Sequence, residues 1–118
     1  MSGLYHRGTQ LQVLADDFVL ATAERFGRAP DEITGRRRDM PLARQRMLGM
    51  VAATSAQHLS LTAIGRAFDK DHTTVLHARK TVADQLAGKP EEREHLDAIR
   101  ARAIELAMQR MKAEGDAA

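Results

Sequence analysis

The chain has 118 residues, 43% of them hydrophobic, which suits one domain with a single modest core. It contains no cysteine, which excludes disulfides and thiolate metal sites, and we expect neither a membrane span nor a secretory leader. Aromatic residues make up only 3%, so the core should be aliphatic and methionine-filled. These features fit a protein of the bacterial cytoplasm or nucleoid.

The net charge of +2 is unevenly distributed along the chain. Between Arg36 and Lys80 there are nine basic and three acidic residues, so this segment carries six net positive charges and the remainder four net negative ones. A basic middle between acidic flanks is typical of a protein that binds a polyanion.

The first part of the chain predicts a tail and then two helical segments. Residues 1–10 lack hydrophobic periodicity, and we expect a loose tail there. Apolar residues recur along one stripe from Leu11 to Phe26, which indicates an amphipathic helix, and Gly27 suits its C-terminal end. Pro30 then opens a short helical turn that carries acidic residues near its N-terminus.

A basic loop, residues 35–39, precedes the next helix. Its three adjacent arginines are either solvated or in contact with a polyanion. Pro41 suits the first turn of a helix that we expect to run to about Ala56. On that helix Arg44 and Arg46 are the exposed basic positions, as ordinary surface charges or as contacts to the polyanion.

Two short helices with a tight turn between them occupy Ser60 to Lys80. Ser60 and Asp71 are the expected N-cap residues, and each helix has one apolar stripe. The second helix, residues 72–86, carries threonine and histidine on its exposed first turn. Such side chains can bond base edges in a DNA major groove, which predicts a helix-turn-helix with 72–86 as its recognition helix.

The last predicted helix starts near Glu91 and has Leu96, Ile99, Ala103 and Leu106 as its inner stripe. Further apolar residues widen that stripe. The helix at 91–113 is therefore either deeply packed or a surface for self-association or a protein partner. Residues 114–118 should fray.

Two runs carry a family resemblance: IGRAF at residues 64–68 and DHTTVLHA at residues 71–78. Together they resemble the C-terminal DNA-binding domain of the bacterial replication initiator DnaA. The resemblance extends back through RRR at 36–38 and LARQR at 42–46, and covers roughly Leu11 to Leu86. It implies an all-α, compact, Trp-repressor-like domain of about six helices over residues 11–113.

The resemblance also implies roles for single residues. His72, Thr73 and Thr74 would contact bases in the major groove, and Arg38 would enter the adjacent minor groove. We predict phosphate contacts at Arg36, Arg37, Arg44, Arg46, Lys70, His77, Arg79 and Lys80.

This chain departs from the family pattern at three places. Its turn is one residue shorter and lacks the family's glycine, which tolerates left-handed geometry; Asp69 can adopt that geometry at some cost, so the turn is feasible. Met47 and Thr54 stand where the family usually has glutamine and lysine, which removes two helper contacts.

The sequence predicts a binding protein and no enzyme. It has no Gly-x-x-x-x-Gly-Lys-Ser/Thr loop for a nucleotide, no catalytic constellation, and no histidine pair at metal-ligand spacing, so we expect no cofactor or metal. We expect a stand-alone protein that binds double-stranded DNA at DnaA-box-like sites and regulates replication initiation or transcription. Two alternatives remain open. One is a protein-interaction module of the same fold that binds the initiator or a regulator; the other is a non-specific architectural DNA binder.

Overall fold

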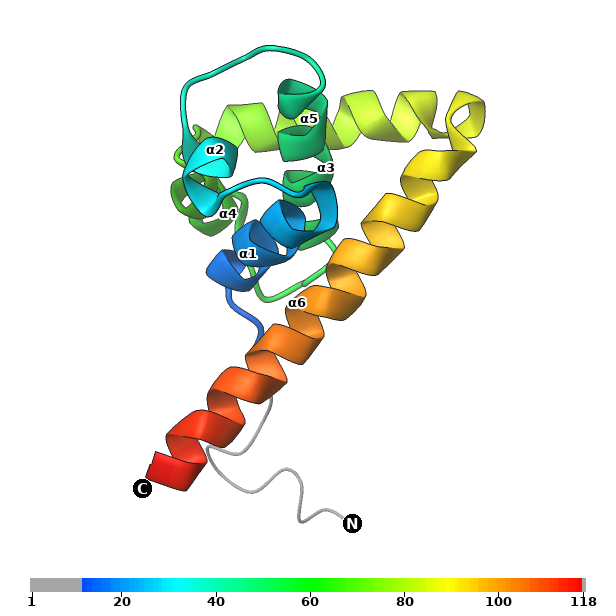
Figure 1. Cartoon of the computed structure of the whole chain (residues 1–118). Coiled ribbons are helices and arrows are strands. Elements are labelled where there is room, and N and C mark those ends of the chain that lie inside the picture. The colour runs from blue at the N-terminus through cyan, green and yellow to red at the C-terminus, as the bar shows by residue number, and fades with distance from the viewer. Residues whose placement is uncertain (1–11, 118) are drawn as a thin grey trace.

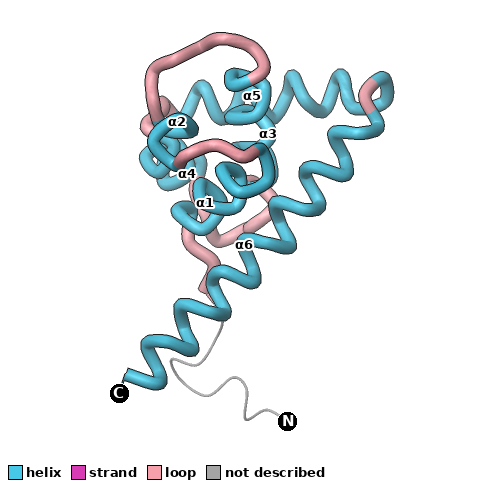
Figure 2. The backbone as a smooth tube through the Cα atoms, in the orientation of Figure 1, coloured by secondary structure: helices cyan, strands magenta, loops and turns pink. Residues whose placement is uncertain are grey.

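The computed structural model describes residues 12–117, and every regular element in that range is helical (Figures 1 and 2). The described chain forms six α-helices and one short 3-10 helix: α1 (Ala15–Phe26), α2 (Pro30–Thr34), α3 (Leu42–Ala53), α4 (Leu61–Phe68), α5 (His72–Gln85), η2 (Leu86–Gly88) and α6 (Pro90–Ala117). This confirms the predicted all-α class and the number of helices. The tail predicted at residues 1–10 lies outside the described residues.

The central helix of the fold is α3. It packs against each of the other five α-helices, and residues 48–53 are all buried. The long helix α6 runs diagonally along one side of the molecule. Helix α5 passes behind α3 in Figure 1, from the end of α4 toward the start of α6. A helix surrounded in this way has little solvent face left for its charged residues.

Helix α1 begins four residues later than the periodicity predicts. The Leu14 amide donates to Oδ2 of Asp17 at 2.7 Å, and this bond caps the first turn at Ala15. The helix ends at Gly27, as predicted, with a left-handed φ of 65° that suits glycine.

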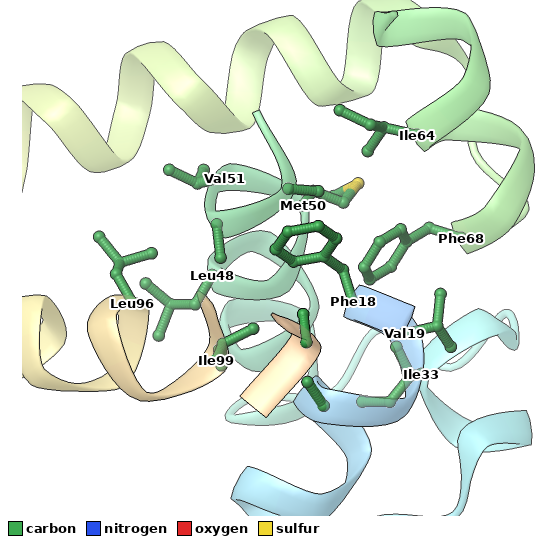
Figure 3. Close-up of a cluster of buried hydrophobic side chains, with 14 of the residues drawn as sticks. Phe18, Val19, Ile33, Leu48, Met50, Val51, Ile64, Phe68, Leu96 and Ile99 are labelled. Carbon is green, nitrogen blue, oxygen red and sulfur yellow. The ribbon is translucent and has the colours of Figure 1, made fainter. Parts of the chain in front are cut away.

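The core is one apolar cluster to which all six α-helices contribute, and Figure 3 shows part of it. Phe18 of α1 and Phe68 of α4 meet beside Met50 of α3, and Ile33 of α2 and Ile99 of α6 are completely buried at 0% exposure. The predicted aliphatic core is confirmed, whereas the expectation that methionines fill it is wrong. Of the methionines, Met50 is a core residue, whereas Met40 and Met108 are exposed.

Helices α1 and α3 approach closely because Gly49 has no side chain. A Cβ at this position would clash with the Thr22 side chain, whose hydroxyl donates to the Phe18 carbonyl at 2.6 Å. The pattern of apolar residues alone does not reveal this contact, because it depends on two helices that are distant in sequence.

Helix α6 closes the core with Leu96, Ile99 and Ala103, as predicted. Leu106 is only half-buried, and Ile104 and Met108 are exposed. The buried part of the apolar stripe is therefore narrower than the stripe itself. The helix also continues to Ala117, through residues where the sequence suggested fraying. Within residues 12–117 no helix is long and apolar enough to cross a membrane.

Candidate nucleic-acid interface

Helices α4 and α5 are joined by a turn of three residues, and each helix begins at a side-chain N-cap. The Ser60 hydroxyl accepts from the Ala63 amide at 3.0 Å, and an Asp71 carboxylate oxygen accepts from the Thr73 amide at 2.9 Å. Both predicted N-caps are confirmed. Asp69 takes the left-handed conformation expected of it, with φ 57° and ψ 45°.

The turn packs tightly onto α4 because position 65 is glycine. A Cβ on Gly65 would lie 2.5 Å from the Lys70 carbonyl oxygen. The Lys70 amide in turn donates to the Gly65 carbonyl at 2.7 Å. The shortened turn therefore keeps a fixed geometry without a glycine of its own.

The recognition helix α5 has one buried stripe and one exposed polar face. Val75, Ala78 and Val82 are buried against α3 and α4, whereas the first three residues of the helix are exposed. The exposed positions of α5 include all those predicted to contact DNA: His72, Thr73, Thr74, His77, Arg79 and Lys80. The helix ends at Gln85 and passes into η2, close to the predicted boundary at residue 86.

The Asp71 carboxylate orients the start of this polar face. Its Oδ1 accepts from both the amide and the hydroxyl of Thr73, each at 2.9 Å, and lies 3.1 Å from Nδ1 of His72. The two bonds from Thr73 lower the pKa of Asp71 below its ordinary value, so the carboxylate is ionised near neutral pH.

Leu76 also lies on this face, 44% exposed, and was missing from the predicted site. It follows His72 by four residues and Thr73 by three, so all three share one side of the helix. Helical spacing could have identified it as an apolar contact for a thymine methyl group.

Three exposed arginines follow α2 in the basic loop, residues 35–39, which lies in the arc between α2 and α3 in Figure 1. Arg37 is engaged: Nε and Nη2 donate to the Asp39 carboxylate at 3.0 and 3.1 Å, and Nη1 lies 3.6 Å from Glu32. Arg36 and Arg38 form no ion pair within residues 12–117. They are the loop's uncompensated charges.

Arg46 is not an exposed position, and that prediction is wrong. Arg46 is only 4% exposed, because α3 is central in the fold. The guanidinium donates to three backbone carbonyls: Ile33 at 2.5 Å, and Glu32 and Arg37 at 2.9 Å each. Burial lowers the pKa of Arg46. With these donors engaged, Arg46 supports the basic loop from inside.

Arg44 also points inward, which corrects the prediction that it is exposed. Nε and Nη2 bind the Glu92 carboxylate at 2.7 and 2.6 Å, and the two side chains are only 13% and 8% exposed. The hydrogen bonds from Arg44 lower the pKa of Glu92, and the same bonds raise that of Arg44. The pair joins α3 to the start of α6.

Lys70 is half-buried beneath the basic loop. Its ammonium donates to carbonyls of the loop's start, Gly35 at 3.0 Å and Thr34 at 3.5 Å, and of its own turn, Phe68 and Asp69 at 3.3 Å each. Desolvation lowers its pKa, and the charges of Arg46, Arg38 and Arg36 lower it further. The predicted phosphate donor is thus occupied by protein carbonyls.

The fold and this site together define a helix-turn-helix domain with an exposed polar recognition helix beside an arginine-bearing loop. The family model of the bacterial dnaA protein helix-turn-helix matches residues 15–82. The chain is also 34% identical over 92 residues to the chromosomal replication initiator protein DnaA of Mycobacteroides abscessus; the match covers 78% of this chain and 19% of that protein.

The chain therefore belongs to the bacterial DnaA helix-turn-helix family. It spans about a fifth of the length of the relative named above. The family is a DNA-binding one, which points to double-stranded DNA as the partner of this domain.

Proposed function

We propose that this protein binds double-stranded DNA in a sequence-specific manner, with α5 in the major groove and the basic loop in the adjacent minor groove. The observation that carries the proposal is the first turn of α5, where three consecutive polar side chains are exposed at a rigidly capped helix end. Helix-turn-helix proteins read bases with this part of the recognition helix.

In this proposal each exposed residue has one role. His72, Thr73 and Thr74 contact base edges, and Arg38 enters the minor groove, where narrow A·T-rich tracts attract arginine. Phosphates are bound by the remaining exposed basic residues, Arg36, Arg37, His77, Arg79 and Lys80. Arg44, Arg46 and Lys70 are left out of this set because their donors are used inside the protein.

The target sites that suit this family are DnaA-box-like. Occupancy of such sites by this chain would regulate replication initiation or transcription. The test is fluorescence anisotropy on two labelled duplexes, one with an initiator box and one with the same bases scrambled, each titrated at two salt concentrations. We expect a clear preference for the box and affinity that falls with salt.

Thr73→Ala is the variant that tests base reading. It should weaken binding to the box by about 1–3 kcal/mol and leave binding to the scrambled duplex nearly unchanged. Equal weakening on both duplexes would contradict the role given to this threonine. Equal binding of both duplexes by the unaltered protein would indicate a non-specific binder, and no binding at low salt would favour the protein-interaction alternative.

A further inference from the structure

Two cations, the buried Arg46 and the half-buried Lys70, bind the basic loop from the protein side. The short helix α2 leaves its last carbonyls without helical partners, as every helix end does. Arg46 donates to the carbonyls of Glu32, Ile33 and Arg37, and Lys70 to those of Thr34 and Gly35. Five of the six carbonyls in residues 32–37 are therefore bound by one of the two side chains.

The start of the loop is held by packing as well. A Cβ on Gly35 would lie 2.8 Å from the Asp31 carbonyl oxygen, so the backbone returns closely over α2 at this point. The tight packing and the bound carbonyls leave the loop one well-defined path out of α2.

Lys70 differs from Arg46 because it comes from the helix-turn-helix itself. It is the second residue of the turn between α4 and α5, two positions before His72. Its ammonium binds carbonyls at the end of α4, Phe68 and Asp69, together with the two carbonyls at the loop start. One side chain thus connects the turn that aims α5 with the loop that carries Arg36 and Arg38.

We propose that Lys70 is a positioning residue that fixes the basic loop relative to the recognition helix, so that minor-groove and major-groove contacts are made in one register. This rests on the proposed function, since it assigns how the two reading elements are kept together. Lys70 itself does not bind DNA. An ammonium has three protons, and here four carbonyls share them, so a phosphate could gain a bond only by displacing one.

The proposal makes Lys70 differ measurably from a phosphate contact. Loss of a phosphate contact weakens every sequence alike and lowers the dependence of log affinity on log salt by about one. Loss of a positioning contact instead weakens the reading of A·T pairs by the loop and leaves discrimination at the base pairs that α5 contacts unchanged. Lys80 provides the matched control, because it is an exposed lysine on α5.

The experiment measures anisotropy for the full chain and its Lys70→Met, Lys70→Arg and Lys80→Met variants. Three duplexes are titrated over a range of salt concentrations. The first is the initiator box, the second is a box whose A·T pairs beside the α5 contact are changed to G·C, and the third is a box changed only at the base pairs that α5 contacts. For Lys70→Met we expect the preference for A·T pairs to fall about tenfold, the size of one lost base contact. Discrimination at the base pairs that α5 contacts should persist. Lys70→Arg should restore the preference, and Lys80→Met should weaken all three duplexes alike.

Lys70→Met behaving like Lys80→Met would overturn the proposal and make Lys70 a phosphate contact. If the unaltered chain binds the three duplexes equally, the proposed function fails instead. Amide hydrogen exchange without DNA then still tests the connection itself. Lys70→Met should speed exchange at residues 35–40 and leave α5 protected; unchanged exchange in the loop would overturn the proposal, and thermal melting by circular dichroism verifies that each variant is folded.

Discussion

The arginines of the basic loop and those of α3 are neighbours in sequence but have opposite environments. Arg36 and Arg38 are exposed and form no ion pair within the described residues, whereas Arg44 and Arg46 bind protein groups with little exposed surface. The difference comes from the elements that carry them: the loop lies on the surface, and α3 is central in the fold. The net charge of a segment therefore overstates the charge that it presents to DNA.

The strongest test of this contrast is Arg46→Ala. The substitution leaves three carbonyls without their donor, and we expect the free energy of unfolding to fall by about 4 kcal/mol. Arg38→Ala is the matched control and should change the stability by less than about 0.5 kcal/mol. Urea denaturation of both variants measures the difference. Similar stabilities would place Arg46 among the surface arginines.

Disruption of the Arg44–Glu92 pair should have the next largest effect on the free energy of unfolding. Either Arg44→Met or Glu92→Leu strands one mostly buried charge and should reduce the stability by about 3 kcal/mol. The double variant Arg44→Met/Glu92→Leu removes both charges and keeps apolar volume, so it should lose less than either single variant. Denaturation of the three variants and the unaltered chain completes a double-mutant cycle. Additive losses would mean that the two side chains do not interact.

The same pair predicts how the stability depends on pH. Arg44 holds the pKa of Glu92 below its ordinary value of 4.5, so the folded chain releases this proton more readily than the unfolded chain. The contribution to stability is then complete above about pH 4.5 and is lost as the pH falls through the lower folded value. Glu92→Gln should decrease the acid sensitivity of the melting temperature. An unchanged pH profile would show that other carboxylates account for it.

The smallest expected effect is a difference between Arg38 and Arg37 in the salt dependence of DNA binding. Arg38→Ala should lower the salt dependence of DNA binding by about one and also the preference for A·T pairs. Arg37→Ala should lower the salt dependence by only about half as much, because Asp39 and Glu32 already compensate its charge. Salt titrations by anisotropy compare the two variants. Equal slopes would indicate that Arg37 leaves its carboxylate partners when DNA binds.

The sequence was sufficient to predict the local features of this protein. Apolar spacing and cap residues predicted the helix-turn-helix, and Ser60, Asp71 and the left-handed Asp69 were found as expected. These features depend on contacts between residues close in sequence. The inward orientation of Arg46 and Lys70 depends on carbonyls 9–14 and 35–36 residues away, respectively, apart from the carbonyls next to Lys70 itself. No periodicity encodes such pairings, so positive charge and the family resemblance suggested phosphate contacts there.

The bond between Thr73 and Asp71 has a consequence for base preference. An ionised carboxylate can only accept, so the Thr73 hydroxyl must direct its proton toward Asp71. What remains for a base edge is an oxygen lone pair and a methyl group. In the proposed complex Thr73 would therefore favour the amino groups of adenine and cytosine or the thymine methyl, and would find no partner in the N7 and O6 acceptors of guanine. A neighbouring acid thus determines which bases this threonine can select.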